Sequence, residues 1–109
     1  MEIIKEKNMI SINGKRIFFN NNIDSVLEFS GFCIILLMDD DISDNNVEAI
    51  DYEGNKLWNI SQLIKLPYPE AYISLHKESD TLFSVVSYNG VKFVIDVSTN
   101  KILNKTITK

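Results

Sequence analysis

The stretch Phe32-Cys33-Ile34-Ile35-Leu36-Leu37-Met38 is the longest uninterrupted apolar run in the sequence. It is far too short for a membrane-spanning helix, which needs about 20 residues. Ser30-Gly31 precedes the run, acidic residues follow it, and its isoleucine and phenylalanine favour strands. A strand this apolar needs cover on both faces, because an exposed one would promote aggregation. The sequence therefore predicts a central, fully covered β-strand at 32–38.

Alternating apolar residues and short turn sequences such as Asn13-Gly14 and Asn89-Gly90 extend this pattern to the whole chain. Strands are predicted at 9–12, 16–19, 23–29, 32–38, 47–52, 56–60, 71–76, 81–88, 91–97 and 101–108. A single helical turn is predicted at 61–66, with Ser61 as its N-cap and Pro67 to stop it. We therefore expect one all-β domain over residues 1–109, in which antiparallel β-meanders of about ten strands pack as a small sandwich or open barrel.

The chain contains an internal repeat. At an offset of 45 residues the segment 51–59 aligns with 96–104, and at an offset of 40 the segment 10–18 aligns with 50–58. Each unit is a strand, a tight turn, then a basic residue followed by bulky apolar ones. A spacing of about 40 to 45 residues fits four short strands per repeat.

The decapeptide Ala-Ile-Asp-Tyr-Glu-Gly-Asn-Lys-Leu-Trp at 49–58 resembles the repeat of quinoprotein-type (PQQ-like) β-propellers, which runs Ala-x-Asp, a glycine turn, then an aliphatic residue and Trp. The segment 94–103 resembles a second copy, with Asn100 for the turn glycine and Leu103 for the Trp. Residues 12–18 resemble a faded third copy.

The resemblance implies two blade-like, four-stranded units at 23–60 and 71–108, preceded by a hairpin at 2–19. It also implies that Trp58 packs between neighbouring blades. About two and a half units are too few for a closed propeller, which needs at least about four blades. The quinone of that family sits on the axis of a complete propeller, so we expect no cofactor here. Instead, the sheets are expected to pack on one another or to assemble with another chain.

Charge and composition exclude several classes of protein. Lys and Arg number 11 against 15 Asp and Glu, a net charge of -4, which disfavours nucleic-acid binding through a basic surface. Isoleucine, asparagine and lysine make up 38 of the 109 residues, which is typical of an A+T-rich bacterial or phage gene. The N-terminal residues lack the apolar stretch of a signal peptide. We therefore expect a cytoplasmic protein with no membrane or nucleic-acid partner.

Few residues suggest catalysis. Cys33 is the sole cysteine, so it can form no intramolecular disulfide, and its apolar neighbours predict a buried, inert thiol. His76 is the sole histidine and is expected to be exposed at a strand end. The four glycines are isolated in turns, so no phosphate-binding loop is formed. We expect no catalytic residues; a hydrolytic pair of carboxylates among the 15 acids remains an alternative.

The loop that follows the apolar run is acidic, with Asp39, Asp40, Asp41 and Asp44 ahead of two asparagines. Such oxygen-rich loops can bind Ca²⁺. The loop nevertheless lacks the glycine and glutamate that an EF-hand requires at its sixth and twelfth positions. A solvated acidic loop is the favoured interpretation and a weak calcium site the alternative, so we assign no metal ligands.

Tyr68 lies between two prolines and next to Glu70, in a segment with no predicted strand. Exposed aromatic residues are the usual anchors of protein interfaces, and carboxylates complement a basic partner. We therefore expect Tyr68, Glu70 and the four acidic-loop aspartates 39–41 and 44 to form an interface. The predicted function is a non-catalytic protein–protein interaction, by analogy that of an immunity protein neutralising a basic toxin. The alternative is a structural blade module within a larger β assembly, whether of identical chains or not.

Overall fold

The computed structural model describes residues 2–38 and 44–107, and this part of the chain is all-β, as predicted. It contains eleven strands and one short 3-10 helix: β1 (Ile3–Glu6), β2 (Met9–Ile12), β3 (Lys15–Phe18), β4 (Ile23–Phe29), β5 (Phe32–Leu37), β6 (Val47–Asp51), β7 (Lys56–Asn59), η1 (Ile60–Gln62), β8 (Tyr72–Ser79), β9 (Leu82–Ser87), β10 (Val91–Asp96) and β11 (Ile102–Ile107). Every strand pair is antiparallel.

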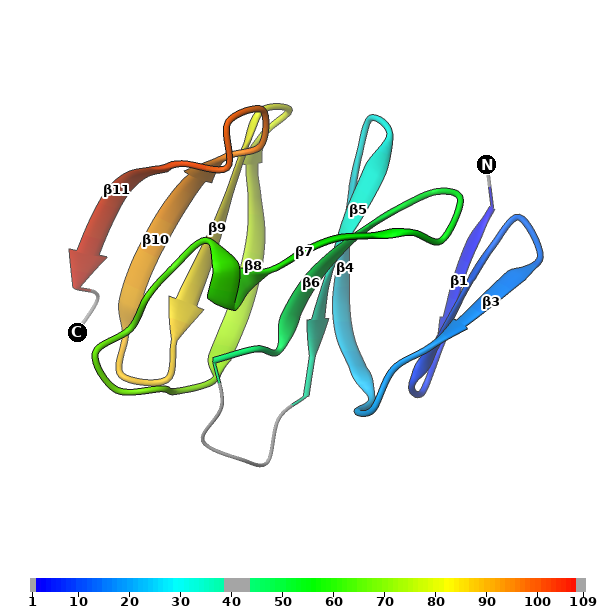
Figure 1. Cartoon of the computed structure of the whole chain (residues 1–109), viewed down its shortest axis with the longest axis horizontal. Helices are drawn as coiled ribbons and strands as arrows, with labels where there is room; N and C mark the ends of the chain where they lie inside the picture. Colours follow the sequence, from blue (N-terminus) through cyan, green and yellow to red (C-terminus); the bar gives the residue numbers. More distant parts are fainter. Residues whose placement is uncertain (1, 39–43, 108–109) are drawn as a thin grey trace.

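The strands form three meander sheets, in each of which neighbours in the sequence are neighbours in space. Sheet A has the order β1-β2-β3, sheet B the order β4-β5-β6-β7, and sheet C the order β11-β10-β9-β8. Figure 1 shows the sheets standing side by side with sheet B in the middle. Two apolar cores separate them, one between sheets A and B and one between sheets B and C. Of the two predicted packings, the sandwich is the one found, with three layers.

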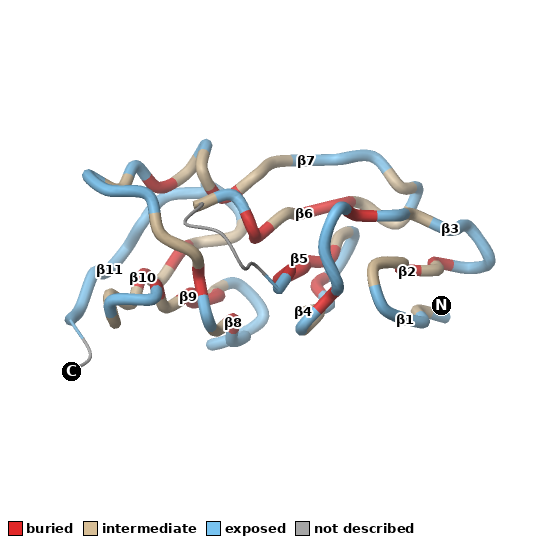
Figure 2. The backbone as a smooth tube through the Cα atoms, turned by 90° about the horizontal axis from the view of Figure 1, so that it is seen from below, coloured by how far each residue is buried: buried red, intermediate tan, exposed pale blue. Residues whose placement is uncertain are grey.

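β5 is the central strand that the apolar run predicted. Ile34 and Leu36 point into the core shared with sheet C, whereas Cys33, Ile35 and Leu37 point into the core shared with sheet A. Because successive side chains of a strand face opposite sides, a strand between two cores carries no polar position. Figure 2 shows buried segments in all three sheets, among them parts of β2, β5, β6, β9 and β10.

The prediction of a two-stranded hairpin at 2–19 is wrong, because this segment forms the three strands of sheet A. The additional strand, β1, joins β2 through a tight turn in which Lys7 has a φ of 52°. Ile3 of β1 pairs with Ile12 of β2. The sequence pattern missed β1 because its last two residues are charged and most of the strand is exposed.

The predicted helical turn at 61–66 is also corrected. The helix is η1, and its N-cap is Asn59, not Ser61. The Asn59 side chain accepts a hydrogen bond from the Ser61 N–H at 3.0 Å. The Gln62 side chain in turn accepts one from the Asn59 N–H at 2.8 Å, which completes a capping box.

Aromatic and hydrogen-bonding contacts join the sheets. Trp58 of sheet B stacks on Phe83 of sheet C with ring centroids 5.7 Å apart. At the other junction, the Lys15 ammonium of sheet A donates a hydrogen bond to the Glu53 carbonyl in the β6–β7 turn at 2.6 Å. The next residue in this turn, Gly54, lies so close that an added Cβ would be 3.1 Å from the Lys15 side chain.

Candidate protein-binding surface

The structure places three of the six predicted interface residues. Asp39, Asp40 and Asp41 lie outside the described residues, whereas Asp44, Tyr68 and Glu70 lie within them. Tyr68 is 81% exposed, in the segment between η1 and β8. Figure 1 shows this segment running past the turn that joins β9 to β10.

Hydrogen bonds fasten this segment to the β9–β10 turn. The Glu70 carboxylate accepts bonds from the Asn89 main-chain N–H at 2.7 Å and from the Asn89 side-chain amide at 2.9 Å. The Tyr88 N–H donates to the Ala71 carbonyl at 2.9 Å. Partial burial acts to raise the pKa of Glu70, but the bonds from Asn89 and the Ser87 hydroxyl outweigh it and lower the pKa below its ordinary value. The Glu70 carboxylate is therefore ionised at neutral pH and joins two segments that lie 19 residues apart in the sequence. We call the two hydrogen bonds between Glu70 and Asn89 the clamp.

Tyr88 and Ile107 lie at the same end of sheet C. Tyr88 is 74% exposed beside the clamp, and Ile107, the last residue of β11, is 69% exposed. Ile107 pairs with Val91, which follows the β9–β10 turn. We call Tyr68, Glu70, Tyr88 and Ile107 the tyrosine surface. Tyr88 and Ile107 are not among the six predicted interface residues. As an aromatic residue Tyr88 could be expected either to anchor a partner or to pack in the core, and the Asn89-Gly90 turn that follows it was a signal for exposure.

The buried residue Asn46 connects two strands at this end of the molecule through hydrogen bonds. Its buried side-chain amide donates to the carbonyls of Leu37 and Tyr72, both at 2.9 Å, and its oxygen accepts from the Tyr72 N–H at 3.0 Å. These bonds tie the end of β5 to the start of β8. Asn46 follows the acidic loop and was a candidate oxygen ligand for the alternative calcium site, but its carboxamide is used within the fold.

Asp44 lies at the same end. It stands two residues before Asn46, and Glu70 stands two residues before Tyr72, so the hydrogen bonds between Asn46 and Tyr72 place both acidic residues at this end. Burial is the main cause that raises the pKa of Tyr72, and the charges of Asp44 and Glu70 add to it. Among the described residues, the Tyr72 hydroxyl has no hydrogen-bond partner.

The residues match the sequence profile of a family described as Domain of unknown function (DUF7957) over positions 1–107. The chain belongs to this family. The match spans all three sheets and the complete tyrosine surface. A comparison with curated proteins found no match.

The other titratable residues have different surroundings. Cys33 is free and fully buried, as predicted, and burial followed by the charge of Glu28 raises its pKa to about 12. His76 is exposed, as predicted, but it lies within β8 and not at a strand end, because β8 continues to Ser79. Within 2–38 and 44–107, no three side chains of His, Cys, Asp and Glu gather as metal ligands. These two described ranges also contain no helix that is long and apolar enough to cross a membrane. The calcium alternative depends mainly on Asp39–Asp41, outside the described residues.

Proposed function

We propose that this DUF7957 protein is a non-catalytic, cytoplasmic binding protein whose tyrosine surface docks on a basic partner protein. The observation that carries the proposal is the clamp between Glu70 and Asn89, which fixes two exposed tyrosines on neighbouring segments. Tyrosine offers a large contact area with few rotatable bonds. Residues held in place before binding lose little further entropy on binding. Neutralisation of a basic toxin is one activity that such a surface would serve.

Charge supports the choice of a basic partner. Asp44 and Glu70 lie at this end of a protein whose net charge is -4. Complementary charge speeds the encounter of two proteins and selects against partners of the wrong sign. The bound complex is therefore expected to weaken as the salt concentration rises.

The test is affinity capture from a native lysate with the full chain as bait. Tyr68→Ala and Tyr88→Ala remove the anchors, and Leu57→Ala is the matched control because Leu57 is a 49% exposed apolar residue on β7 of sheet B. We expect a stoichiometric, salt-sensitive basic partner with the wild type and with Leu57→Ala, and about a tenfold or greater loss with either tyrosine variant. Equal capture by all four baits would contradict the proposal.

A second candidate function is that of a structural module in a larger β assembly. It is favoured by β11, which is exposed along its whole length and carries Ile102 and Leu103 at the edge of sheet C. Free strand edges of this kind are templates for pairing with another chain. Light scattering after gel filtration is the test: a mass that grows with concentration supports assembly of identical chains, and a constant monomer mass opposes it.

A further inference from the structure

We propose that an extended acidic segment of a partner protein adds to the free edge of β3 and becomes the fourth strand of sheet A. This site is separate from the tyrosine surface, because it lies on the other outer sheet of the stack. Four observations support it: the missing strand, the free main-chain groups of β3, an adjoining pocket and the local charge.

Sheet A has three strands within the described residues, whereas sheets B and C each have four. In sheet B the outermost strand, β7, pairs with β6, and in sheet C the outermost strand, β11, pairs with β10. β3 stands third in its sheet, as β6 and β10 stand third in theirs, and in the described chain its one partner is β2. The position of a fourth strand next to β3 is therefore open.

The hairpin geometry identifies which main-chain groups are free. β2 and β3 are joined by the two-residue turn Asn13-Gly14, whose φ angles are 51° and 86°. Such a turn makes Ile12 and Lys15 a hydrogen-bonded pair, and hydrogen-bonded pairs alternate along an antiparallel ladder. The N–H and carbonyl groups of Arg16 and Phe18 therefore point away from β2, where an added strand would meet them.

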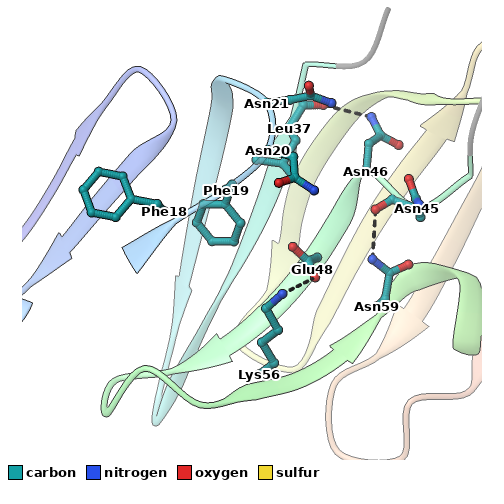
Figure 3. A pocket seen from close by; sticks show the side chains of 10 residues that line it. All are labelled: Phe18, Phe19, Asn20, Asn21, Leu37, Asn45, Asn46, Glu48, Lys56 and Asn59. Carbon is teal, nitrogen blue, oxygen red and sulfur yellow. Dashed lines mark hydrogen bonds and ion pairs between the residues drawn. The ribbon is translucent and has the colours of Figure 1, made fainter. Parts of the chain in front are cut away.

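A pocket of about 190 Å³ adjoins the end of β3 (Figure 3). It lies between the β3–β4 connection, which supplies Phe19 and Asn20, and one face of strands β6 and β7. Glu48 and Asn59, which face one another across β6 and β7, form part of its lining. Sheet A leaves this part of sheet B uncovered, and a fourth strand would extend sheet A over it. The Asn20 carboxamide in the lining of the pocket would bind main-chain or polar groups of that strand.

Charge indicates the chemistry of the added strand. The sequence of β3 is Lys-Arg-Ile-Phe, with no acid, in a protein of net charge -4. The Lys15 ammonium is bonded to the Glu53 carbonyl, so Arg16 is the cation of β3 that would meet an added strand. Arg16 lies opposite Ser11 and Phe18 opposite Met9, so both side chains are on the face of sheet A away from the core. Phe18 is 65% exposed there. A strand with a carboxylate opposite Arg16 and an apolar residue beside Phe18 would complement this edge.

The same charges argue against β11 of a second copy as the occupant. β11 contains Lys105, follows Lys101 and has no acidic residue, so its pairing with β3 would bring like charges together. The proposed occupant is therefore a segment of a different protein.

The test begins with a display library of random linear peptides selected on the full chain. The strongest binders are synthesised, and their Kd is measured by fluorescence anisotropy. We expect sequences in which Asp or Glu alternates with apolar residues. Phe18→Pro removes an outward N–H but no bond to β2, whereas Phe18→Ala removes the ring and keeps the N–H. Loss of main-chain pairing is expected to weaken binding about tenfold more in Phe18→Pro than in Phe18→Ala.

Two further measurements show whether the peptides bind at β3 and not at the tyrosine surface. The double variant Tyr68→Ala/Tyr88→Ala is the control for the other site and should bind the peptides as the wild type does. Amide chemical shifts of the wild type should change at Arg16, Phe18 and Lys56 when peptide is added, a result that needs no variant to fold. The proposal is overturned by selection of peptides without acidic alternation, by a lack of any selected binder, or by shift changes away from β3.

Discussion

At the scale of single residues, Asp51 and Asp96 hold equivalent positions in the two aligned repeats, and each accepts main-chain hydrogen bonds within a turn. Asp51 accepts hydrogen bonds from the N–H groups of Glu53 and Asn55, and Asp96 accepts them from Ser98 and Thr99. The bond from the Asn55 N–H is the largest cause that lowers the pKa of Asp51, and the Ser98 hydroxyl is the largest for Asp96. Each carboxylate therefore organises the turn between the last two strands of its sheet.

This lowering of the pKa predicts a dependence of stability on pH. A carboxylate whose pKa is lower in the folded state stabilises the fold above its unfolded pKa, about 3.9, and that contribution is lost as the pH falls through the folded pKa. We expect the melting temperature to fall below about pH 4, and to fall less in Asp51→Asn/Asp96→Asn. Thermal unfolding followed by circular dichroism checks this. Identical pH profiles of the melting temperature for the wild type and the double variant would show that the two aspartates do not cause the loss of stability in acid.

Cys33 gives a second prediction at this scale. Its thiol is buried between sheets A and B, and its pKa of about 12 leaves almost no thiolate at neutral pH. A thiol-specific reagent such as Ellman's reagent should therefore not react with the native protein within the time in which it titrates one thiol per chain in guanidinium chloride. Fast reaction of the native protein would mean that the core between sheets A and B opens readily.

At the scale of elements, the β6–β7 turn holds sheet A against sheet B. Gly54 in this turn has a φ of 92°, and a Cβ added there would contact Lys15 and Ile17 at 3.1 to 3.3 Å. Gly31, in the β4–β5 turn, has a similar φ of 87° but open space around the added Cβ. Gly31→Ala therefore serves as a matched control for backbone strain alone.

We expect Gly31→Ala to lower the free energy of unfolding by about 1 to 2 kcal/mol, through the left-handed backbone. Gly54→Ala should cost more, because Lys15 and Ile17 must also shift. Chemical denaturation measures both. Equal losses of unfolding free energy in the two variants would indicate that Lys15 and Ile17 can move away from the added Cβ without destabilising the fold.

The same elements show how far sequence reasoning reaches. The central strand at 32–38 could be predicted because seven apolar residues need two covered faces, and β5 has them. β1 could not, because an exposed edge strand carries little apolar pattern. Asn59 was overlooked as a cap because Ser61 is also a good N-cap residue.

The site was predicted only in part, for a related reason. Tyr68 and Glu70 stand out within one proline-bounded segment. Their link to Tyr88 depends on the bond between Glu70 and Asn89, 19 residues apart, and local patterns do not encode such contacts. Ile107 was overlooked because the sequence predicts a strand at 101–108 but does not show that this strand lies exposed at the edge of a sheet.

At the scale of the whole molecule, β5 contributes side chains to both apolar cores, so we expect the three sheets to unfold together. Ile34 belongs to the core with sheet C and Ile35 to the core with sheet A, and both are fully buried. Ile34→Ala and Ile35→Ala should each lower the free energy of unfolding by about 2 to 5 kcal/mol. Each variant should still unfold in a single transition in calorimetry. Two separate transitions would show that the cores melt independently.

If the tyrosine surface docks on a basic partner, the main-chain amides beneath it become protected in the complex. Hydrogen-exchange mass spectrometry of the chain, with and without the captured partner, measures this protection. Slower exchange is expected in peptides covering 66–72 and 87–91, where the clamp lies, and unchanged exchange in 23–29 of sheet B. Unchanged exchange at 66–72 and 87–91 in a saturated complex would show that the partner docks elsewhere.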